Sequence, residues 1–336
     1  MACVAAGLCF PSGAAALPAK GTRVTIAATG DLLIHSPVWQ RALSYGGGRR
    51  YDFRPMFRKI GPLIAGADLA LCHVETPLTE GAPHGYPSFR TPAALATAVR
   101  ATGWDVCSTA SNHTLDGGQR GVNSTLDILD KAGVRHAGSY RTRSAAREPT
   151  ILEAHGVRVA FLSYTALTNG QRVPHEWSVN MARAPRILKD AKRARQAGAD
   201  AVVVNVHWGD EFRSGVTRSQ RSLAATLTRS KYVTAVVGQH VHVVQPIRWV
   251  NGKPVVFGEG NLISNQTAAC CPAASQDGLI ALLDLRVGAA GVRAKRVRYL
   301  PTYVRHPDYT VVRAGGRSRA RTIRVAGRSK RVVPIR

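Results

Sequence analysis

Short apolar runs alternate with amphipathic stretches from residue 22 to about residue 245. Runs such as ADAVVVNVHWG (199–209) and YVTAVVG (232–238) are rich in β-branched residues, which is typical of buried strands. The stretches between them place apolar side chains three and four positions apart, which is typical of helices that cover a sheet. This alternation predicts an α/β fold with a largely parallel sheet whose faces are covered by helices.

The expected strands and helices follow one another regularly along the chain. Strands are predicted over residues 22–31, 67–75, 104–113, 157–165, 199–209 and 232–238, and helices over 55–67, 91–103, 117–133, 184–198 and 219–230. In the second helix, Thr91 is the expected N-cap and Pro92 the first helical residue. Three later strands, over 246–250, 253–261 and 278–287, have no helices between them, so we expect hairpins and mixed sheets.

Charge is distributed unevenly over the 336 residues. The net charge is +26, and residues 286–336 contain 15 Lys or Arg but a single acidic residue, Asp308. Such a surface attracts polyanions. Residues 313–336 contain nine basic and no acidic residues, and alternating apolar positions in RTIRVAG and KRVVPI predict a strand-like or mobile tail.

The first 20 residues are small and apolar, with no charge before Lys20. The pattern AAALPA favours a signal peptide cleaved near Ala19 and therefore an exported protein; the alternative is an unstructured tail. The predicted organisation is this segment at 1–20, one domain at 21–305 and a basic extension at 306–336. In an exported protein Cys72 and Cys107, both in predicted strands, could form disulfides or remain as buried thiols.

Polar side chains with metal-ligating groups follow the predicted strands. In open α/β sheets, sites form beyond the carboxyl ends of the strands. In the sequence GQHVHVVQP the two histidines are two positions apart, so both imidazoles can point to one place. Each side chain alone has an ordinary structural explanation, such as a turn, a cap or a satisfied histidine. Together they predict a mixed N/O site for Mn, Fe or Zn, with one or two ions. The residues are Asp31, Glu75, Asn112, His113, His207, His240 and His242.

The motifs that carry these residues resemble the CapA family of capsule-synthesis or poly-gamma-glutamate biosynthesis proteins, a branch of the calcineurin-like metallophosphoesterases. They are GD (30–31), ETP (75–77), SNHTLDGG (111–118), HWGDEF (207–212), GQHVHVVQP (238–246) and FGEGNLI (257–263). The resemblance covers about residues 22–300 and implies a four-layer α/β/β/α sandwich with metal ligands at the strand ends. It implies that Asp31 ligates the first metal, that Glu75 bridges and that Asn112 is a ligand. It implies also that His113 is a catalytic acid and that the remaining metal-binding histidines are His207, His240 and His242.

The sequence departs from the superfamily pattern at its first motif. Asp-x-His is expected there, and Leu33 occupies the third position. His35 is the nearest candidate to replace it; otherwise the first metal subsite is weak. Other departures are Glu259 in FGEGN and the pair His73 and Val74 before ETP.

Four further residues are candidates for roles around the site. Asp116 either orients the His113 imidazole or caps the following helix. Trp208 and Glu211 are expected to line the cleft, and Arg90 is a candidate anion-binding group because a guanidinium pairs well with carboxylate or phosphate.

The sequence therefore favours a metal-dependent hydrolase or transferase of the cell envelope, acting on a phosphoester or an anionic polymer. A membrane-associated assembly for polymer synthesis or export is a possible partner. The alternative is a non-catalytic binder of an anionic polymer with a degenerate metal site, suggested by Leu33. Nucleic acid is a weaker candidate partner, because aromatic residues are 6% of the chain and few stand among the C-terminal arginines.

Overall fold

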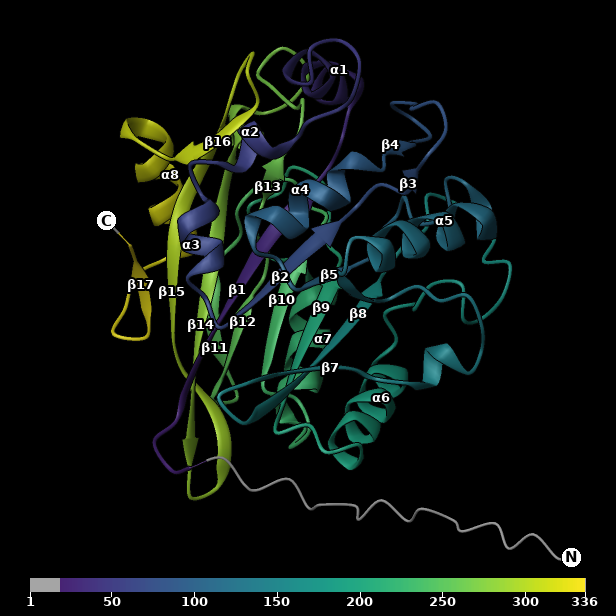
Figure 1. Ribbon diagram of the computed structural model, residues 1–336. Helices are drawn as coiled ribbons and strands as arrows, with labels where there is room; N and C mark the ends of the chain where they lie inside the picture. Colours follow the sequence, from purple (N-terminus) through teal and green to yellow (C-terminus); the bar gives the residue numbers. More distant parts are fainter. Residues whose placement is uncertain (1–18, 336) are drawn as a thin grey trace, which may run out of the picture.

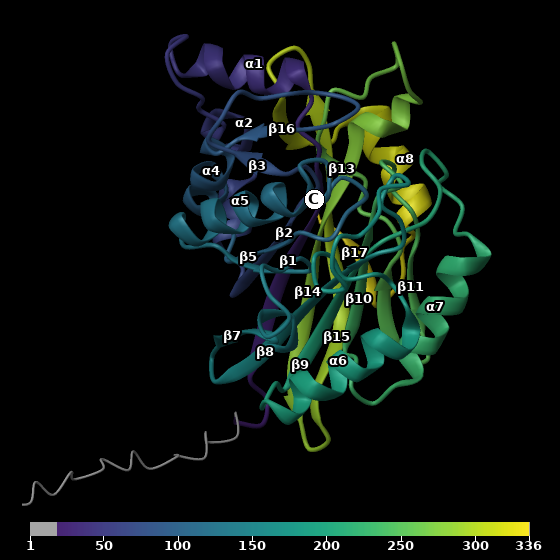
Figure 2. The ribbon, with the colours of Figure 1, turned by 90° about the vertical axis from the view of Figure 1, so that its right-hand side faces the viewer.

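Two β-sheets pack face to face, and helices cover the outer face of each, in the computed structural model, which describes residues 19–335. Figure 2 shows these layers edge on, with α4 and α5 on one side and α6 and α7 on the other. The predicted signal peptide lies outside the described residues, except for its last two positions. This arrangement is the four-layer α/β/β/α sandwich that the sequence predicted.

The first sheet has the order β16-β15-β14-β1-β2-β5-β6, with β13 beside β1 and β17 beside β15 (Figure 1). Its central strands β1, β2, β5 and β6 are parallel, whereas β14, β15 and β16 are antiparallel, as expected for hairpins late in the chain. The bounds are β1 Arg23–Leu32, β2 Leu69–Val74, β5 Val106–Ser108, β6 Arg135–Ala137, β13 Asn261–Ile263, β14 Asp277–Gly288, β15 Gly291–Arg305, β16 Thr310–Arg313 and β17 Val332–Pro334.

The second sheet has the order β11-β12-β10-β9-β8-β7. Strands β8, β9, β10 and β12 are parallel, and β7 and β11 are antiparallel edges. The bounds are β7 Thr150–Ala154, β8 Val157–Thr165, β9 Ala201–His207, β10 Ala235–Gln239, β11 Ile247–Val250 and β12 Lys253–Val256; a separate small pair is β3 Leu78–Thr79 with β4 Thr91–Pro92.

Helices α1 to α5 lie with the first sheet, and α6 and α7 lie on the second. The bounds are α1 Ser36–Tyr45, α2 Arg54–Phe57, α3 Gly61–Ala65, α4 Ala94–Thr102, α5 Gly118–Lys131, α6 Ala184–Gln196, α7 Arg218–Arg229 and α8 Gly316–Ala326, with 3-10 turns at Ala145–Arg147 and Ala273–Gln276. Within residues 19–335 no helix combines the length and the apolar character that a membrane span requires.

Three apolar cores separate the four layers. In β9, Ala201 and Val203 face the core between the sheets, whereas Val202 and Val204 face α6 and α7. A third core lies between the first sheet and its helices. Side chains alternate between the faces of a strand, so a strand buried on both faces reads as a continuous apolar run.

Several predicted element boundaries were wrong; the helix expected over 55–67, for example, is divided into α2 and α3. The helix expected from Thr91 begins at Ala94, because Thr91 and Pro92 form β4 and the Thr91 N–H donates to the Pro77 carbonyl (2.8 Å). The strand expected over 104–113 ends at Ser108. The residues after it form a turn in which Ser111 N–H donates to Thr114 Oγ1 (2.7 Å), so local side-chain bonds replace the sheet ladder.

The C-terminal residues continue the same structure. RTIRVAG, which we predicted as strand-like, lies in helix α8, while KRVVPI contains the predicted strand as β17. In α8, Thr322 and Ala326 are four residues apart and both buried, which is a helical spacing. The helix packs on β14 and β15, and β17 pairs with β15 in parallel.

Cys72 and Cys107 face each other in the neighbouring strands β2 and β5 and are joined by a disulfide. From the sequence, both a disulfide and a pair of buried free thiols were open alternatives for these two cysteines.

Candidate metal centre

The predicted metal ligands meet at the carboxyl ends of parallel strands from both sheets. Asp31 lies near the end of β1, Glu75 directly follows β2, and His207 ends β9. His240 and His242 follow β10. The strand ends converge because all these strands run in the same direction at the interface of the two sheets.

The distances show a single compact cluster. The His242 Nδ1 atom lies 3.1 Å from Asp31 Oδ2, and His242 Nε2 lies 3.8 Å from Glu75 Oε1. On the other side, His207 Nε2 lies 2.9 Å from Asn112 Oδ1 and 3.9 Å from Glu75 Oε1. The structure thus brings together five of the six predicted ligands around the Glu75 carboxylate.

The sixth ligand, His240, lies against the same cluster from its own loop. Its ring centroid is 4.6 Å from that of His207, and its backbone N–H donates to Asp31 Oδ1 (3.3 Å). Both histidines of this loop have positive φ, 90° for His240 and 55° for His242. Non-glycine residues in this region of backbone space are strained and concentrate at functional sites.

The sequence reasoning missed one member of the cluster, His73. Its Nε2 atom lies 3.0 Å from His207 Nδ1 and 3.8 Å from Asp31 Oδ1, and its side chain is fully buried. His73 stands opposite Asp31 in the β1–β2 register. The signal was present in the sequence, because His73 and Glu75 are two positions apart on a strand, the same spacing that drew attention to His240 and His242.

His73, and not His35, is the histidine beside Asp31. Leu33 is buried in the core. The His35 Nδ1 atom lies 3.2 Å from both the Asn265 backbone nitrogen and the Leu33 carbonyl, so backbone groups engage it. Asp31, His73 and His207 each offer a ligand atom within 4.8 Å of the others. The missing Asp-x-His histidine therefore leaves a complete group of donors.

The donor set fits a divalent metal ion. Both Glu75 carboxylate oxygens and His240 Nδ1 are buried with no hydrogen-bond partner. Buried polar atoms without partners cost free energy unless a ligand or ion satisfies them. Two further groups of atoms lie within 4.8 Å of one another: Asp31 with Glu75 and His242, and Glu211 with His240 and His242. Imidazole and carboxylate donors suit Mn, Fe or Zn.

Burial and mutual charge shift the pKa values of the cluster strongly. Burial, together with the Asp31 carboxylate, raises the pKa of Glu75 well above its usual value. Burial and the His242 charge lower the pKa of His240 to about 3. Burial alone would also lower the pKa of His242, but the Glu75 and Asp31 carboxylates outweigh it and raise that pKa to about 9. These opposed shifts indicate that the buried carboxylates and imidazoles interact strongly across the cluster.

His113 lies at the rim with its ring fixed from two sides. Its Nδ1 atom lies 2.9 Å from Asp116 Oδ2, and the Phe89 ring packs edge-on at 4.7 Å between centroids. Asp116 also accepts hydrogen bonds from the Phe89 N–H (2.6 Å) and Gln171 Nε2 (2.9 Å). The N-cap of α5 is Gly117, with no side-chain cap. Of the two roles considered for Asp116, the geometry supports orientation of the imidazole.

The three predicted substrate contacts lie in different environments. The Glu211 carboxylate is at the exposed edge of the cluster, beside His240 and His242. Arg90 is exposed and directly follows Phe89, whose ring packs on His113. The prediction that Trp208 lines the cleft was wrong. Trp208 is 2% exposed, packs with Phe257 under the outer helices and donates from Nε1 to the Phe257 carbonyl (2.8 Å).

The segment 257–263 supports the cluster from behind. Asn261 Oδ1 lies 3.1 Å from His242 Nδ1, and buried Glu259 accepts a hydrogen bond from Gln239 Nε2 (2.7 Å). Burial raises the pKa of Glu259 well above its usual value. Gly30 is needed at this crossing, because a Cβ there would lie 1.8 Å from the Gly260 carbonyl oxygen. The close approach brings Asp31 onto the cluster.

Known proteins resemble the chain in sequence over most of its length. "Capsule biosynthesis protein CapA" of Bacillus anthracis is 25% identical over 258 residues, covering 74% of this chain and 61% of the relative. "PGA biosynthesis protein CapA" of Bacillus subtilis is 24% identical over 217 residues, covering 63% of this chain and 57% of the relative. The matched region thus spans about three fifths of the length of these two relatives.

A solved structure resembles the fold. The calcineurin-like phosphoesterase YfkN of Bacillus subtilis superposes with a TM-score of 0.51 at 15% identity, over 90% of this chain and 96% of that one. At this identity the likeness establishes the metallophosphoesterase fold alone. The family described as "Bacterial capsule synthesis protein PGA_cap" matches residues 25–266. This match covers most of the chain, and the fold and the cluster at the strand ends agree with it. The chain therefore belongs to the PGA_cap family of bacterial capsule synthesis proteins.

Proposed function

We propose that this protein is a metal-dependent hydrolase or transferase that acts in the synthesis or export of an anionic capsule polymer of the poly-gamma-glutamate type. One observation carries the catalytic part of this proposal: a fully buried glutamate with two unpartnered oxygens is surrounded by imidazoles and a second carboxylate. Burying such a group costs free energy, and a bound cation would offset that cost.

Asp31, His73, Glu75, Asn112, His207, His240 and His242 would hold the metal. A bound divalent ion supplies Lewis-acid polarisation of the scissile group and lowers the pKa of water. Glu211 lies at the exposed edge of the cluster beside His240 and His242 and would add a third carboxylate to the site.

His113 is the proton donor in this scheme. Asp116 engages Nδ1, so Nε2 is the atom that faces the reacting group. In hydrolysis the attacking water forms a bond to the reacting centre and gives up one proton to solvent. The bond to the leaving oxygen breaks, and the Nε2 proton passes to that oxygen. Phe89 holds the ring in place, and Arg90 on the same segment attracts a negatively charged substrate to the rim.

The relatives support the biological part of the proposal. Two are named for capsule or PGA biosynthesis, and the net charge of +26 suits work on a polyanion. The apolar residues 1–20 support export to the cell envelope, where a membrane-associated polymer assembly would be the partner.

The test is metal analysis combined with turnover. We expect the purified chain to carry stoichiometric Mn, Fe or Zn and to hydrolyse a generic phosphodiester in a chelator-sensitive manner. Glu75→Gln should abolish both, whereas the same substitution at exposed Glu80 should abolish neither. A folded protein without bound metal after incubation with each ion would refute the catalytic proposal.

A further inference from the structure

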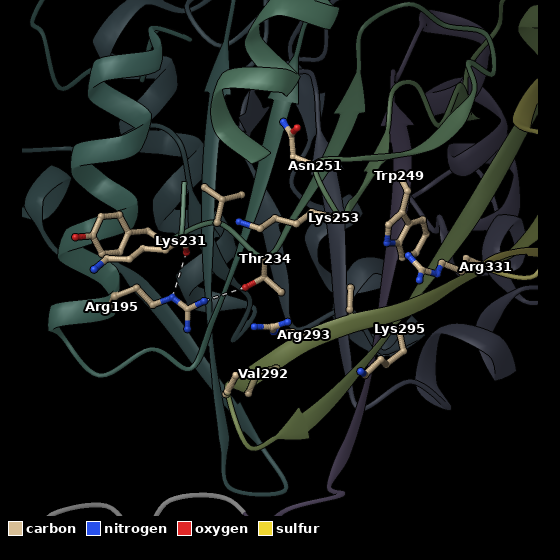
Figure 3. A pocket seen from close by; sticks show the side chains of 16 residues that line it. Arg195, Lys231, Thr234, Trp249, Asn251, Lys253, Val292, Arg293, Lys295 and Arg331 are labelled. Carbon is tan, nitrogen blue, oxygen red and sulfur yellow. Dashed lines mark hydrogen bonds between the residues drawn. The ribbon is translucent and has the colours of Figure 1, made fainter. Parts of the chain in front are cut away.

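A second, strongly basic site lies at the opposite end of the strands from the metal centre. It is a cleft of about 840 Å³ between the start of β10, the β11–β12 turn and the start of β15. Figure 3 shows side chains from both sheets directed into it. Strand β10 is five residues long, with the cleft at its beginning and His240 just past its end. The two sites are therefore roughly 15 Å apart or more, at about 3.3 Å per residue.

The cleft is lined by cations and by no carboxylate. Its six basic residues come from five separate elements and loops, so the topology and not one charged run gathers them. They are Arg195, Lys231, Lys253, Arg293, Lys295 and Arg331.

Little of this charge is neutralised within the protein, where Asp200 acts on Arg195 from beyond ion-pair distance. Across residues 19–335, none of the six forms an ion pair with a carboxylate, in contrast to the nearby Arg296 and Arg298, which share Asp284. Burial and the charges of Arg195 and Arg293 lower the pKa of Lys253, which is what unbalanced positive potential produces. Positive charges held together without counterions favour an external polyanion.

Some of the cations are fixed in place. Arg195 donates to the Tyr232 carbonyl and to Thr234 Oγ1, both at 3.1 Å (Figure 3), and Lys253 donates to the Ser230 carbonyl. Lys231, Arg293 and Lys295 are exposed at the mouth. The cleft thus combines a preformed cationic floor with exposed charges at its edge, and the side chains of the floor lose little entropy on binding.

The positive surface continues beyond the cleft on one side. Trp249 and Arg331 are shared with a neighbouring hollow of about 600 Å³, which adds Arg248, Arg328 and Lys330. A single small anion would use one such pocket; a line of cations across two hollows suits a chain with repeated negative charges.

The aromatic residues of the cleft favour a carboxylate polymer over nucleic acid. The Arg331 guanidinium lies 5.7 Å from the Trp249 ring centroid, and the Lys231 ammonium 5.5 Å from that of Tyr232. Their π-faces are engaged by cations, so few stacking platforms remain for bases. Among described residues the one exposed large hydrophobic side chain is Tyr86, beside Phe89 at the other end, so the cleft has no apolar anchor for a membrane.

We propose that this cleft is a binding site for a linear polycarboxylate chain, separate from the metal centre, which holds the polymer while the metal centre acts. The choice of carboxylate as the repeating anion rests on the proposed function; the existence of a polyanion site does not.

The test compares two sets of charge reversals of equal size. Lys231→Glu, Arg293→Glu and Lys295→Glu remove the mouth of the cleft, while Arg58→Glu, Lys59→Glu and Arg147→Glu change the same net charge at exposed positions elsewhere. Binding of labelled poly-gamma-glutamate is measured by fluorescence anisotropy over a salt series. We expect the cleft set to weaken binding by about tenfold or more and to flatten the salt dependence, and the control set to change affinity less than about threefold.

A neutral set, with Gln at the three cleft positions, covers the case in which the reversal does not fold. Equal losses in the cleft and control sets, or no loss in either cleft set, would overturn the proposal. Tighter wild-type binding of duplex DNA or polyphosphate than of poly-gamma-glutamate, at equal charge concentration, would overturn carboxylate as the ligand.

Metal content and phosphodiester turnover, measured on the same variants, should be unchanged. If the cleft variants lose polymer binding and the wild type shows no turnover, the catalytic proposal is refuted while the proposed polymer-binding cleft is supported.

Discussion

The metal centre and the basic cleft lie at opposite ends of the same strands and treat charge in opposite ways. At the carboxyl ends, carboxylates and imidazoles are buried together, and the unsatisfied atoms are acceptors such as the Glu75 oxygens. At the amino ends, cations line an open cleft without a carboxylate. The first arrangement requires a cation and the second attracts an anion. The comparison teaches that net charge alone says little about sites, since a chain of +26 buries a cluster of carboxylates and imidazoles that fits a divalent metal ion.

The largest expected effect is that of substituting Glu75, which should impair the metal centre and leave the basic cleft intact. We expect Glu75→Gln to lower phosphodiester turnover by about 1,000-fold, or roughly 4 kcal/mol of transition-state stabilisation, because the central anionic donor is lost. Poly-gamma-glutamate affinity should not change. Turnover, elemental analysis and anisotropy measure the three quantities, with Glu80→Gln as the matched control. A parallel loss of polymer binding would show that the two ends form one site.

The next largest effect distinguishes the metal ligands of the centre from its proton donor. His113→Gln should lower turnover by about 100-fold with unchanged metal content, since general acid catalysis typically contributes this much. Asp116→Asn should lower it by about tenfold and alter the pH profile, because the ring loses its orienting carboxylate.

The control for this pair is His155→Gln, at an exposed histidine that pairs with Asp68. His73→Ala should behave differently and reduce metal content, as a member of the Asp31 group. Loss of metal in His113→Gln would place His113 among the ligands instead.

A smaller effect distinguishes two cations within the cleft. Arg195→Ala should reduce the free energy of unfolding by about 2 kcal/mol, because the Tyr232 and Ala199 carbonyls and Thr234 Oγ1 lose a half-buried donor. Lys295→Ala should change it by less than about 0.5 kcal/mol, as an exposed residue without an ion pair. Urea denaturation measures both. Equal costs would mean that Lys295 has a structural role in the native protein.

The smallest effect concerns the paired charges beside the cleft. Burial alone would raise the pKa of Asp284, but hydrogen bonds from Arg298 and Arg296 outweigh it and hold the pKa below its usual value. The pair therefore contributes stability above the unfolded-state pKa of about 3.9, and this contribution is lost as pH falls through the folded-state pKa.

Asp284→Asn should thus lower the free energy of unfolding by about 1 kcal/mol at pH 7, a figure reduced for the partial exposure of both arginines. The difference from wild type should narrow at more acidic pH. A difference that stays constant between pH 7 and pH 3 would exclude the ion pair as its origin.

The periodicity of the chain predicted most of the elements but not their ends. Strands such as Ala201–His207 were found where nearly continuous apolar runs predicted them, because burial on both faces leaves few polar positions. Helix α8 was missed, since RTIRVAG has apolar residues that satisfy both a strand and a helix period. Only its packing on β14 and β15 favours the helix.

The sequence by itself determined the alternation of strands and helices and placed a metal-ligating side chain after each of several strands. The tertiary structure alone decided that His73, and not His35, joins Asp31, and that Trp208 belongs to the core. It alone also gathered Arg195, Lys253, Arg293 and Arg331 into one cleft. The physical reason is that periodicity records which face of an element is buried, whereas a site depends on which elements become neighbours, and strand order and register set those neighbours.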